Sequence, residues 1–224
     1  AYPHLNVKIV GTHYGIKVGE DGATHQAIED IAIMRAITGM EVYSPCDQWE
    51  TKAVLEYVAS TSNPCYIRLG RSKVEDVYDE CDTLDVTKIN VIHKGTSKVA
   101  VFATGLMVQS SLGALQFLNE KGIDPTIIDV CAIKPTDEAG IARILESHDE
   151  IFTVEEHSVI GGLGSMICEV AADTFPKRIH RIGMRGFAES GDWKALLKEY
   201  KLDDAGVAEQ IVDGLNKGIS SSNF

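Results

Sequence analysis

Residues 6–37 read NVKIVGTHYGIKVGEDGATHQAIEDIAIMRAI, and their pattern decides the fold class. Residues 6–12 are apolar and rich in β-branched side chains, which predicts a strand. A glycine-rich loop follows over 15–22, and Thr24 is then placed to cap a helix that runs to about Ile37. This order of strand, loop and helix is the unit from which parallel sheets are built.

The same alternation continues along the chain. Further strands are predicted at 41–44, 65–69, 99–103, 126–130, 151–154 and 178–182, and further helices at 47–60, 107–120, 135–146, 163–172, 191–199 and 205–217. Strands that alternate with helices form mostly parallel sheets, with the helices packed on their faces. We therefore expect an α/β protein with two domains of mostly parallel sheet and flanking helices.

The alternation is interrupted over residues 72–90. Charged residues are frequent in this stretch and apolar residues are scattered. Such a composition is typical of an exposed connection between two cores. We therefore expect the boundary between the two domains to fall between about 72 and 92.

The charge of the chain excludes some partners. Its 224 residues include 21 Lys and Arg against 33 Asp and Glu, a formal net charge of −12. A nucleic-acid binder needs a basic face, and anionic lipid repels an acidic protein, so we expect neither nucleic acid nor membrane as a partner. The sequence contains no run of about 18 apolar residues, which is the length that a transmembrane helix needs. An anionic small substrate is compatible only where a few cations are focused locally.

The cysteines predict a reducing compartment. There are five of them, widely spaced and without a C-x-x-C pair, so the sequence favours neither a disulfide framework nor a zinc ribbon. Reduced thiols and the lack of a signal-peptide pattern predict a cytoplasmic protein. The chain opens Ala-Tyr-Pro, without methionine, and enters a strand at once. Such a start is typical of an internal fragment or of a processed terminus.

The stretch 11–26 carries the chemistry. It places His13 at the carboxyl end of a strand, with Asp21 and His25 beyond the glycine loop. In open α/β sheets ligands gather at the carboxyl ends of strands. Glycines allow a backbone to turn and to approach a ligand closely. Imidazoles and carboxylates could share protons with substrate hydroxyls near neutral pH.

Other interpretations of these residues compete. His13 could be a partly buried histidine bonded to a carbonyl, and Glu20 and Asp21 could merely favour the start of a helix. A metal site of His13, Asp21 and His25 is allowed by residue type, but the spacing is not that of a His-x-x-x-His ligand pair. Substrate contact is therefore favoured over metal, and we predict no metal ligands.

The segment G-E-D-G-A-T-H-Q, preceded by T-H and a glycine loop, resembles the pyrimidine-domain signature of transketolases. It is similar above all to the separately encoded carboxyl-terminal subunit of split enzymes. Further matching stretches follow in the same order over nearly the whole chain. They are S-P-C-D-Q-W-E-T (44–51), Y-I-R-L-G-R (66–71), V-E-E-H-S-V-I-G-G-L-G-S (154–165) and E-S-G (189–191).

The resemblance implies a domain plan. Residues 1–75 would be the back half of a transketolase pyrimidine domain, which in the family binds thiamine diphosphate. Residues 76–92 would be a linker, and residues 93–224 would be the transketolase carboxyl-terminal domain.

The resemblance also implies the site residues, position by position. The strand-end histidine, here His13, would lie beside the cofactor and the donor sugar, and Asp21 would contact a substrate hydroxyl. His25 would help to bind the substrate and its phosphate end, so that His13 and His25 carry the catalytic roles. Arg71 would bind the substrate phosphate. Gly70 replaces the usual serine, so any hydroxyl contact from that position is lost.

The spacing of two arginines supports the choice of Arg71. Arg68 and Arg71 are three residues apart, and an odd separation places side chains on opposite faces of a strand. Since a guanidinium offers a fork of donors to a phosphate, one of the two should face the substrate. We expect Arg71 to do so, and Arg68 to meet solvent or an acidic neighbour.

The activity implied is transfer of a two-carbon ketol unit between sugar phosphates, as in the pentose phosphate pathway, with thiamine diphosphate and Mg²⁺. The family's upstream glutamate, its aromatic cluster and its diphosphate-binding domain lie outside this stretch of sequence. We therefore expect the chain to be inactive alone and to act as a homo-oligomer, with an amino-terminal transketolase subunit, or both. The alternatives are a fragment of 1-deoxyxylulose-5-phosphate synthase, which would use pyruvate, and a non-catalytic interaction module.

The turn at 161–164, G-G-L-G, follows a predicted strand and opens a predicted helix, as a phosphate loop would. Its spacing is not G-x-G-x-x-G, and no Lys-Ser or Lys-Thr follows, so we favour a purely structural role. Glu155, Glu156 and His157 are interpreted as a solvated or domain-interface cluster, and Trp49 and Trp193 as packing residues.

Overall fold

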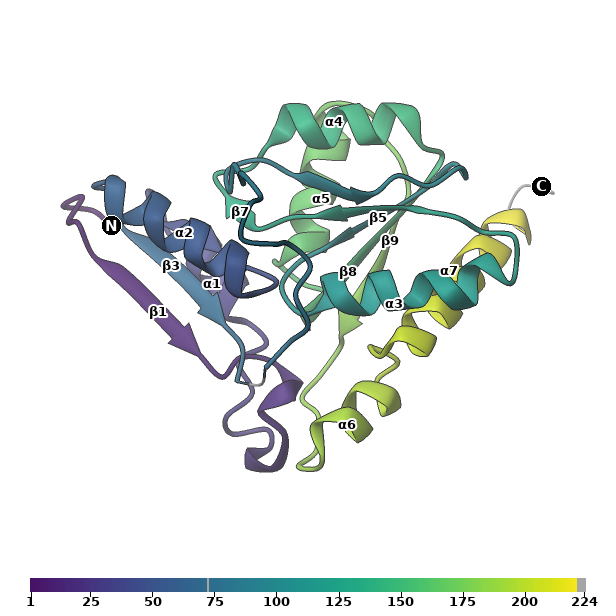
Figure 1. Cartoon of the computed structure of the whole chain (residues 1–224), viewed down its shortest axis with the longest axis horizontal. Helices are drawn as coiled ribbons and strands as arrows, with labels where there is room; N and C mark the ends of the chain where they lie inside the picture. Colours follow the sequence, from purple (N-terminus) through teal and green to yellow (C-terminus); the bar gives the residue numbers. More distant parts are fainter. Residues whose placement is uncertain (72, 221–224) are drawn as a thin grey trace.

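The computed structural model describes residues 1–71 and 73–220, and it contains two sheets (Figure 1). The first sheet has the strand order β1 (Lys8–Thr12), β3 (Cys65–Leu69), β2 (Glu41–Tyr43) and β7 (Ala132–Lys134). Its first three strands are parallel, and β7 is antiparallel to β2. The helices of this part are α1 (Asp30–Ala36) and α2 (Gln48–Ser60), and a short 3-10 segment, η1 (Ile16–Asp21), lies in the glycine loop.

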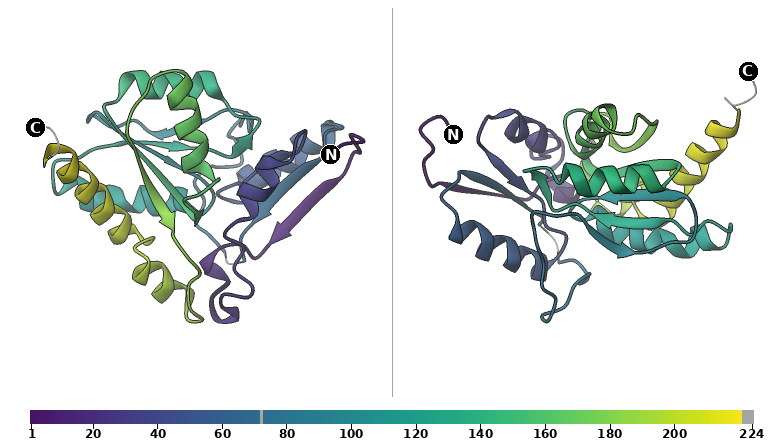
Figure 2. Two further views of the ribbon diagram at one scale, coloured as in Figure 1. Left: turned by 180° about the vertical axis from the view of Figure 1, so that it is seen from behind. Right: turned by 90° about the horizontal axis from the view of Figure 1, so that it is seen from above.

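The second sheet has the order β4 (Asn90–His93), β6 (Thr126–Asp129), β5 (Val99–Ala103), β8 (Glu150–Ser158) and β9 (Ile179–Met184). All its pairs are parallel except β4 with β6. Helices α3 (Met107–Asn119) and α7 (Asp204–Ser220) cover one face, and α4 (Glu138–Ser147) and α5 (Leu163–Asp173) cover the other (Figures 1 and 2). Helix α6 (Trp193–Glu199) packs against η1. The predicted α/β class with two mostly parallel sheets is confirmed.

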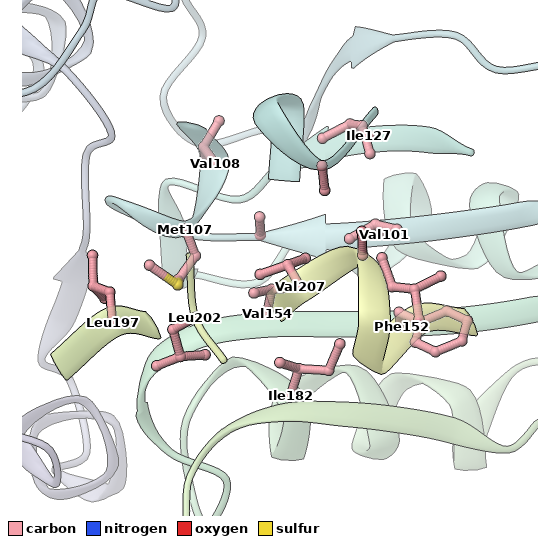
Figure 3. Packing of buried hydrophobic residues seen from close by; sticks show 14 of the residues in the cluster. Val101, Met107, Val108, Ile127, Phe152, Val154, Ile182, Leu197, Leu202 and Val207 are labelled. Carbon is pink, nitrogen blue, oxygen red and sulfur yellow. The ribbon is translucent and has the colours of Figure 1, made fainter. Parts of the chain in front are cut away.

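The central strand β5 divides the core between the two faces of its sheet. Val101 packs with Phe152 and with the helical residues Met107 and Val207 on one side (Figure 3). Its neighbour Phe102 belongs to a different cluster on the other side, as the twofold period of a strand requires. A strand buried on both faces has a continuous apolar sequence, which explains why this strand was predictable.

The second cluster joins the two sheets. It contains Ile31 and Val42 from the first part of the chain together with Phe102 and Ile128 from the second. Strand β7 also returns to the first sheet after the chain has entered the second. The domain boundary at 72–92 stays a prediction; Ser72 lies outside the described residues.

Three sequence-based element bounds were wrong. Helix α1 begins at Asp30 rather than at Thr24, because the carbonyls of Ala27 and Ile28 accept hydrogen bonds from Gly15 and Ser158 and cannot continue a helix. Helix α4 begins at Glu138, after Asp137 has capped it by accepting from the Gly140 N–H. Strand β8 extends through Ser158, so residues 155–157 lie within a strand.

The edge strand β1 and the thiols complete the surface description. Val7, Ile9 and Val10 are 49%, 39% and 47% exposed, so the first sheet ends in an apolar strand edge. All five cysteines are free, and Cys46, Cys65 and Cys131 are buried. Among the described residues, no helix combines the length and the apolar character needed to cross a bilayer.

Candidate functional site

The candidate residues lie where two parallel strands end. Thr12 of β1 pairs with Leu69 of β3, so His13 and Gly70 follow at the same edge of the first sheet. The chain turns sharply there, because His13 has a positive φ of 64°. This edge is the carboxyl end of the sheet, where the sequence places a ligand site.

Asp21 and Arg71 form an ion pair at this edge. Arg71 Nη1 lies 2.9 Å from Asp21 Oδ2, and it also donates to the carbonyl of Val18 at 2.8 Å. The Asp21 side chain is 47% exposed and the Arg71 side chain is 42% exposed, so a ligand can reach both. The fold therefore brings together two of the four predicted residues, although fifty positions separate them in the sequence.

The two imidazoles are exposed on the same loop and contact their neighbours. His13 Nδ1 lies 2.9 Å from Thr12 Oγ1, and His25 Nδ1 lies 2.9 Å from Thr24 Oγ1. No hydrogen bond joins either imidazole to Asp21 or Arg71 in the part of the chain that the structure describes. The roles of all four residues stay predictions.

The loop that carries these residues rests on the second half of the chain. Gln26 accepts from the N–H of Ala188 at 2.8 Å and donates to its carbonyl at 3.1 Å. Ser190 donates to the carbonyl of Glu20, and the Gly191 N–H donates to that of Gly19. The E-S-G segment at 189–191 therefore supports the back of the loop.

Two cavities adjoin the loop without including the four candidates. A cavity of about 870 Å³ is lined by Lys17 and Trp193, and one of about 350 Å³ by Lys17, Tyr14 and Gly70. His13, Asp21, His25 and Arg71 line neither. All four of these residues are exposed.

Arg68 is a structural cation under the site. It is 1% exposed, and its Nε donates to Asp30 Oδ2 at 2.8 Å, while its guanidinium stacks on the Tyr14 ring at 3.6 Å. Burial alone would raise the pKa of Asp30, but Arg68 outweighs this effect and holds that pKa below its usual value. Of the two expected surroundings for Arg68, the acidic neighbour is right and solvent is wrong.

The side chain of Glu155, a residue of strand β8, binds the first residues of helix α5. Its carboxyl accepts from the N–H groups of Leu163 and Gly164 at 2.7 and 2.9 Å. Burial raises the pKa of Glu155 to about 7, although these two bonds oppose the rise. The amides that a phosphate would use are therefore taken by a protein side chain, and the structural interpretation of the G-G-L-G turn is confirmed.

The cluster at 155–157 is buried between the two sheets, not solvated. The backbone N–H of Ala32 donates to His157 Nε2 at 3.4 Å. Burial, with Arg68 nearby, lowers the pKa of His157 to about 4, so the ring is neutral at physiological pH. The interface interpretation is correct, and the solvated one is wrong. Trp193 also packs as expected, half-buried against the core beneath Lys17.

The sequence did not predict that Glu50 and Asp129 form a buried pair of acids. Cys46, Glu50 and Asp129 each offer an atom within 4.8 Å of the others, and they form the one such potential metal-ligand group among residues 1–71 and 73–220. The alternative metal site of His13, Asp21 and His25, which the sequence disfavoured, is not among the groups of this kind that the described residues form. Burial raises the pKa of both carboxyls, which hydrogen-bond each other. We predict that the two acids share one proton, because Glu50 Oε1 and Asp129 Oδ1 have no partner elsewhere among the described residues.

Replacing Glu50 by glutamine should flatten the dependence of stability on pH. A raised pKa means that the stability contribution of the pair is complete below the ordinary glutamate pKa of about 4.3 and is lost as pH rises through the raised value. A glutamine side chain would mimic the protonated acid at every pH. The variant should match the parent at about pH 5 and exceed it at about pH 9 in urea unfolding.

The exposed Glu146 on α4 supplies the control for this measurement. Glu146→Gln should leave the pH profile unchanged, since an exposed carboxyl is stabilised equally in both states. If Glu50→Gln ran parallel to the parent between the two pH values, the shared proton would be excluded.

Comparisons with known proteins agree with this arrangement. The family model "Transketolase, pyrimidine binding domain" matches residues 1–76, and "Transketolase, C-terminal domain" matches residues 87–207. A transketolase C-terminal section of Methanocaldococcus jannaschii is 43% identical over 221 residues, which cover 97% of this chain and 69% of that protein. One subunit of an apulose-4-phosphate transketolase of Phocaeicola vulgatus is 35% identical over 219 residues, covering 97% and 70%.

A solved structure is similar over the same extent. It is a split-gene transketolase, described as an inactive beta4 tetramer, with a TM-score of 0.88 and 35% identity. The match covers 96% of this chain and 69% of that one. The similarity therefore extends across both sheets and the loop between β1 and α1.

Proposed function

The chain belongs to the transketolase family, and from that premise we propose that it supplies the substrate-binding part of an enzyme that transfers a two-carbon ketol unit between sugar phosphates. The observation that carries this proposal is the exposed Asp21–Arg71 pair, built on the G-E-D-G-A-T-H-Q loop at the carboxyl ends of β1 and β3. We also propose that this enzyme acts in the pentose phosphate pathway. We further propose a cytoplasmic location, and the five free thiols support this location.

Each candidate has chemistry that suits a sugar phosphate. Both bonds of Arg71 come from Nη1, and its fork carries further N–H groups that can meet phosphate oxygens. Asp21 can accept a hydrogen bond from a substrate hydroxyl. His13 and His25 carry ring nitrogens that can donate or accept hydrogen bonds, and their exposure lets them reach a bound sugar.

Thiamine diphosphate, when bound, supplies the carbanion chemistry of such a transfer. Among the described residues, the one group that could hold a metal ion is the set of Cys46, Glu50 and Asp129. It lies in the core rather than at the exposed loop that carries the four candidates. We propose that the diphosphate and Mg²⁺ are held by an amino-terminal transketolase subunit, by a second copy of this protein in a homo-oligomer, or by both.

The purified chain should show no ketol transfer alone, even with thiamine diphosphate and Mg²⁺. Activity should appear when a matching amino-terminal transketolase subunit is added, because that subunit supplies the missing cofactor contacts. A coupled assay with a ketose phosphate donor and an aldose phosphate acceptor measures this. Turnover by the homogeneous chain above a no-protein control would contradict the proposal.

Two further arms of the assay address the alternatives. Activity with pyruvate as donor in place of a ketose phosphate would indicate a 1-deoxyxylulose-5-phosphate synthase. No activity with either donor, despite a stable complex of the two subunits, would indicate an interaction module.

A further inference from the structure

One carboxyl group of the second sheet fastens the loop that carries the candidate residues. Glu156 of β8 accepts a hydrogen bond from the backbone N–H of Lys17 on its Oε1, at 2.7 Å, and the preceding residue Ile16 is fully buried. The Glu156 side chain is fully enclosed. Ile16 and Lys17 begin η1, which ends at Asp21, so the anchor and the candidate lie on the same short segment.

The backbone of the loop is shaped around this carboxyl. Gly15 has a φ of 72°, and a Cβ added there would overlap Glu156 Oε1. Only glycine combines this backbone conformation with so close an approach. The carboxyl therefore packs directly against the chain between His13 and Asp21.

The other end of the loop is tied to the same position on β8. Arg68 Nη2 donates to the backbone carbonyl of Glu156 at 3.0 Å and to that of Ala27 at 3.1 Å. The Gly15 N–H donates to the Ala27 carbonyl at 3.1 Å, which closes the neck of the loop. The two chain segments that form this neck both depend on residue 156. The side chain of Glu156 holds the segment at Lys17, and its backbone carbonyl binds Arg68, which holds the segment at Ala27.

We propose that Glu156 is a positioning residue, which fixes the backbone of residues 15–18 and thereby sets where His13 and Asp21 stand relative to Arg71. Its catalytic consequence rests on the proposed function; its effect on the loop does not. Misplacing a reacting group by about 1 Å can cost on the order of a hundredfold in rate, so a loosened loop should be visible in the kinetics.

The neighbouring Glu155 provides a matched control. It is equally buried on the same strand, but its side chain points to the opposite face and bonds the start of α5 rather than the loop. If Glu156 merely stabilised the core, then removing either carboxyl should have the same consequences. If Glu156 positions the loop, only its own removal should disturb residues 15–18.

The first measurement is amide hydrogen exchange on the full chain with Glu156→Ala, Glu156→Gln and Glu155→Ala. Exchange at Ile16 and Lys17 should accelerate more than tenfold in Glu156→Ala and stay unchanged in Glu155→Ala, as the loss of one specific acceptor predicts. Glu156→Gln keeps an acceptor oxygen and should retain most of the protection. Gly15→Ala adds a Cβ that should displace the Glu156 carboxyl from the loop. This variant replaces Glu156→Ala in the measurement if Glu156→Ala fails to fold.

The second measurement is kinetics of the complex with the amino-terminal subunit. Glu156→Ala should lower kcat and raise KM for phosphorylated sugars, so that kcat/KM falls roughly ten- to hundredfold, whereas Glu155→Ala should change neither constant, even where it lowers Tm as much. Unchanged exchange at Lys17, or equal KM effects of the two variants, would overturn the proposal. A complex without ketol transfer would overturn the proposed function, and the exchange data would still decide whether Glu156 fixes the loop.

Discussion

Replacing Arg68 by methionine should lower the free energy of unfolding by about 3–5 kcal/mol, the cost of removing one partner from a buried ion pair. Two side chains donate hydrogen bonds to the Asp30 carboxylate among the bonds that the structure describes. Arg68 supplies the only compensating charge, and the Tyr66 hydroxyl is the other donor. Its loss would also leave the carbonyls of Ala27 and Glu156 without this donor. Urea unfolding, with the midpoint and slope compared to the parent, measures the effect.

Two further variants make this prediction specific. Lys201→Met breaks the exposed pair with Glu209 and should change the free energy of unfolding far less than Arg68→Met, because solvent screens the pair. Adding Asp30→Asn to Arg68→Met removes the stranded charge, so the double variant should recover part of the loss. A cost for Arg68→Met as small as that for Lys201→Met would show that Arg68 is not needed at the junction.

Replacing Arg71 by alanine should raise KM for phosphorylated substrates roughly ten- to hundredfold in the assembled enzyme and change kcat much less. The contact to the phosphate is made in the ground state as much as in the transition state. A lost charge-assisted hydrogen bond is worth about 1.5–3 kcal/mol, which corresponds to that range of affinity. Steady-state kinetics with a sugar phosphate and with the same sugar lacking its phosphate tests the assignment.

The controls separate phosphate binding from a general loss of the site. Arg143 is an exposed arginine on α4, and Arg143→Ala should leave both constants unchanged. Asp21→Ala and His25→Ala should alter kcat as well as KM, because these residues touch groups closer to the reacting carbons in the proposed site. An equal penalty of Arg71→Ala on phosphorylated and unphosphorylated sugars would refute the phosphate role.

The sequence predicted the elements whose signals are local. Strand β5 is an uninterrupted apolar run, and helix α2, predicted at 47–60, begins after Asp47, which accepts from the Glu50 N–H. Strands β4 and β7 were missed: β4 begins in the stretch that was interpreted as a linker, and each of the two pairs antiparallel with a strand far away in the chain. The start of α1 was misplaced for a similar reason, since the bonds of Ala27 go to distant groups.

The site shows the same division. The identity and order of His13, Asp21, His25 and Arg71 could be recognised from the sequence, but the Asp21–Arg71 contact depends on how η1 folds back. The burial of Glu155 and Glu156 was not predictable from residue type, because such acids are mostly exposed. A glutamate seven to nine residues before a glycine-opened helix is a signal that could have indicated the cap on α5.

Strand β7 has a consequence for the order in which the protein folds on the ribosome. Val42 of β2 pairs with Lys134, so β2 stays open until β7 has left the exit tunnel. By then β5 and β6 have already been synthesised, and the nascent first sheet has an open edge at β2 as well as at β1. Synthesis rates of about 5–20 residues per second leave that strand open for several seconds, a period in which chaperones can bind it.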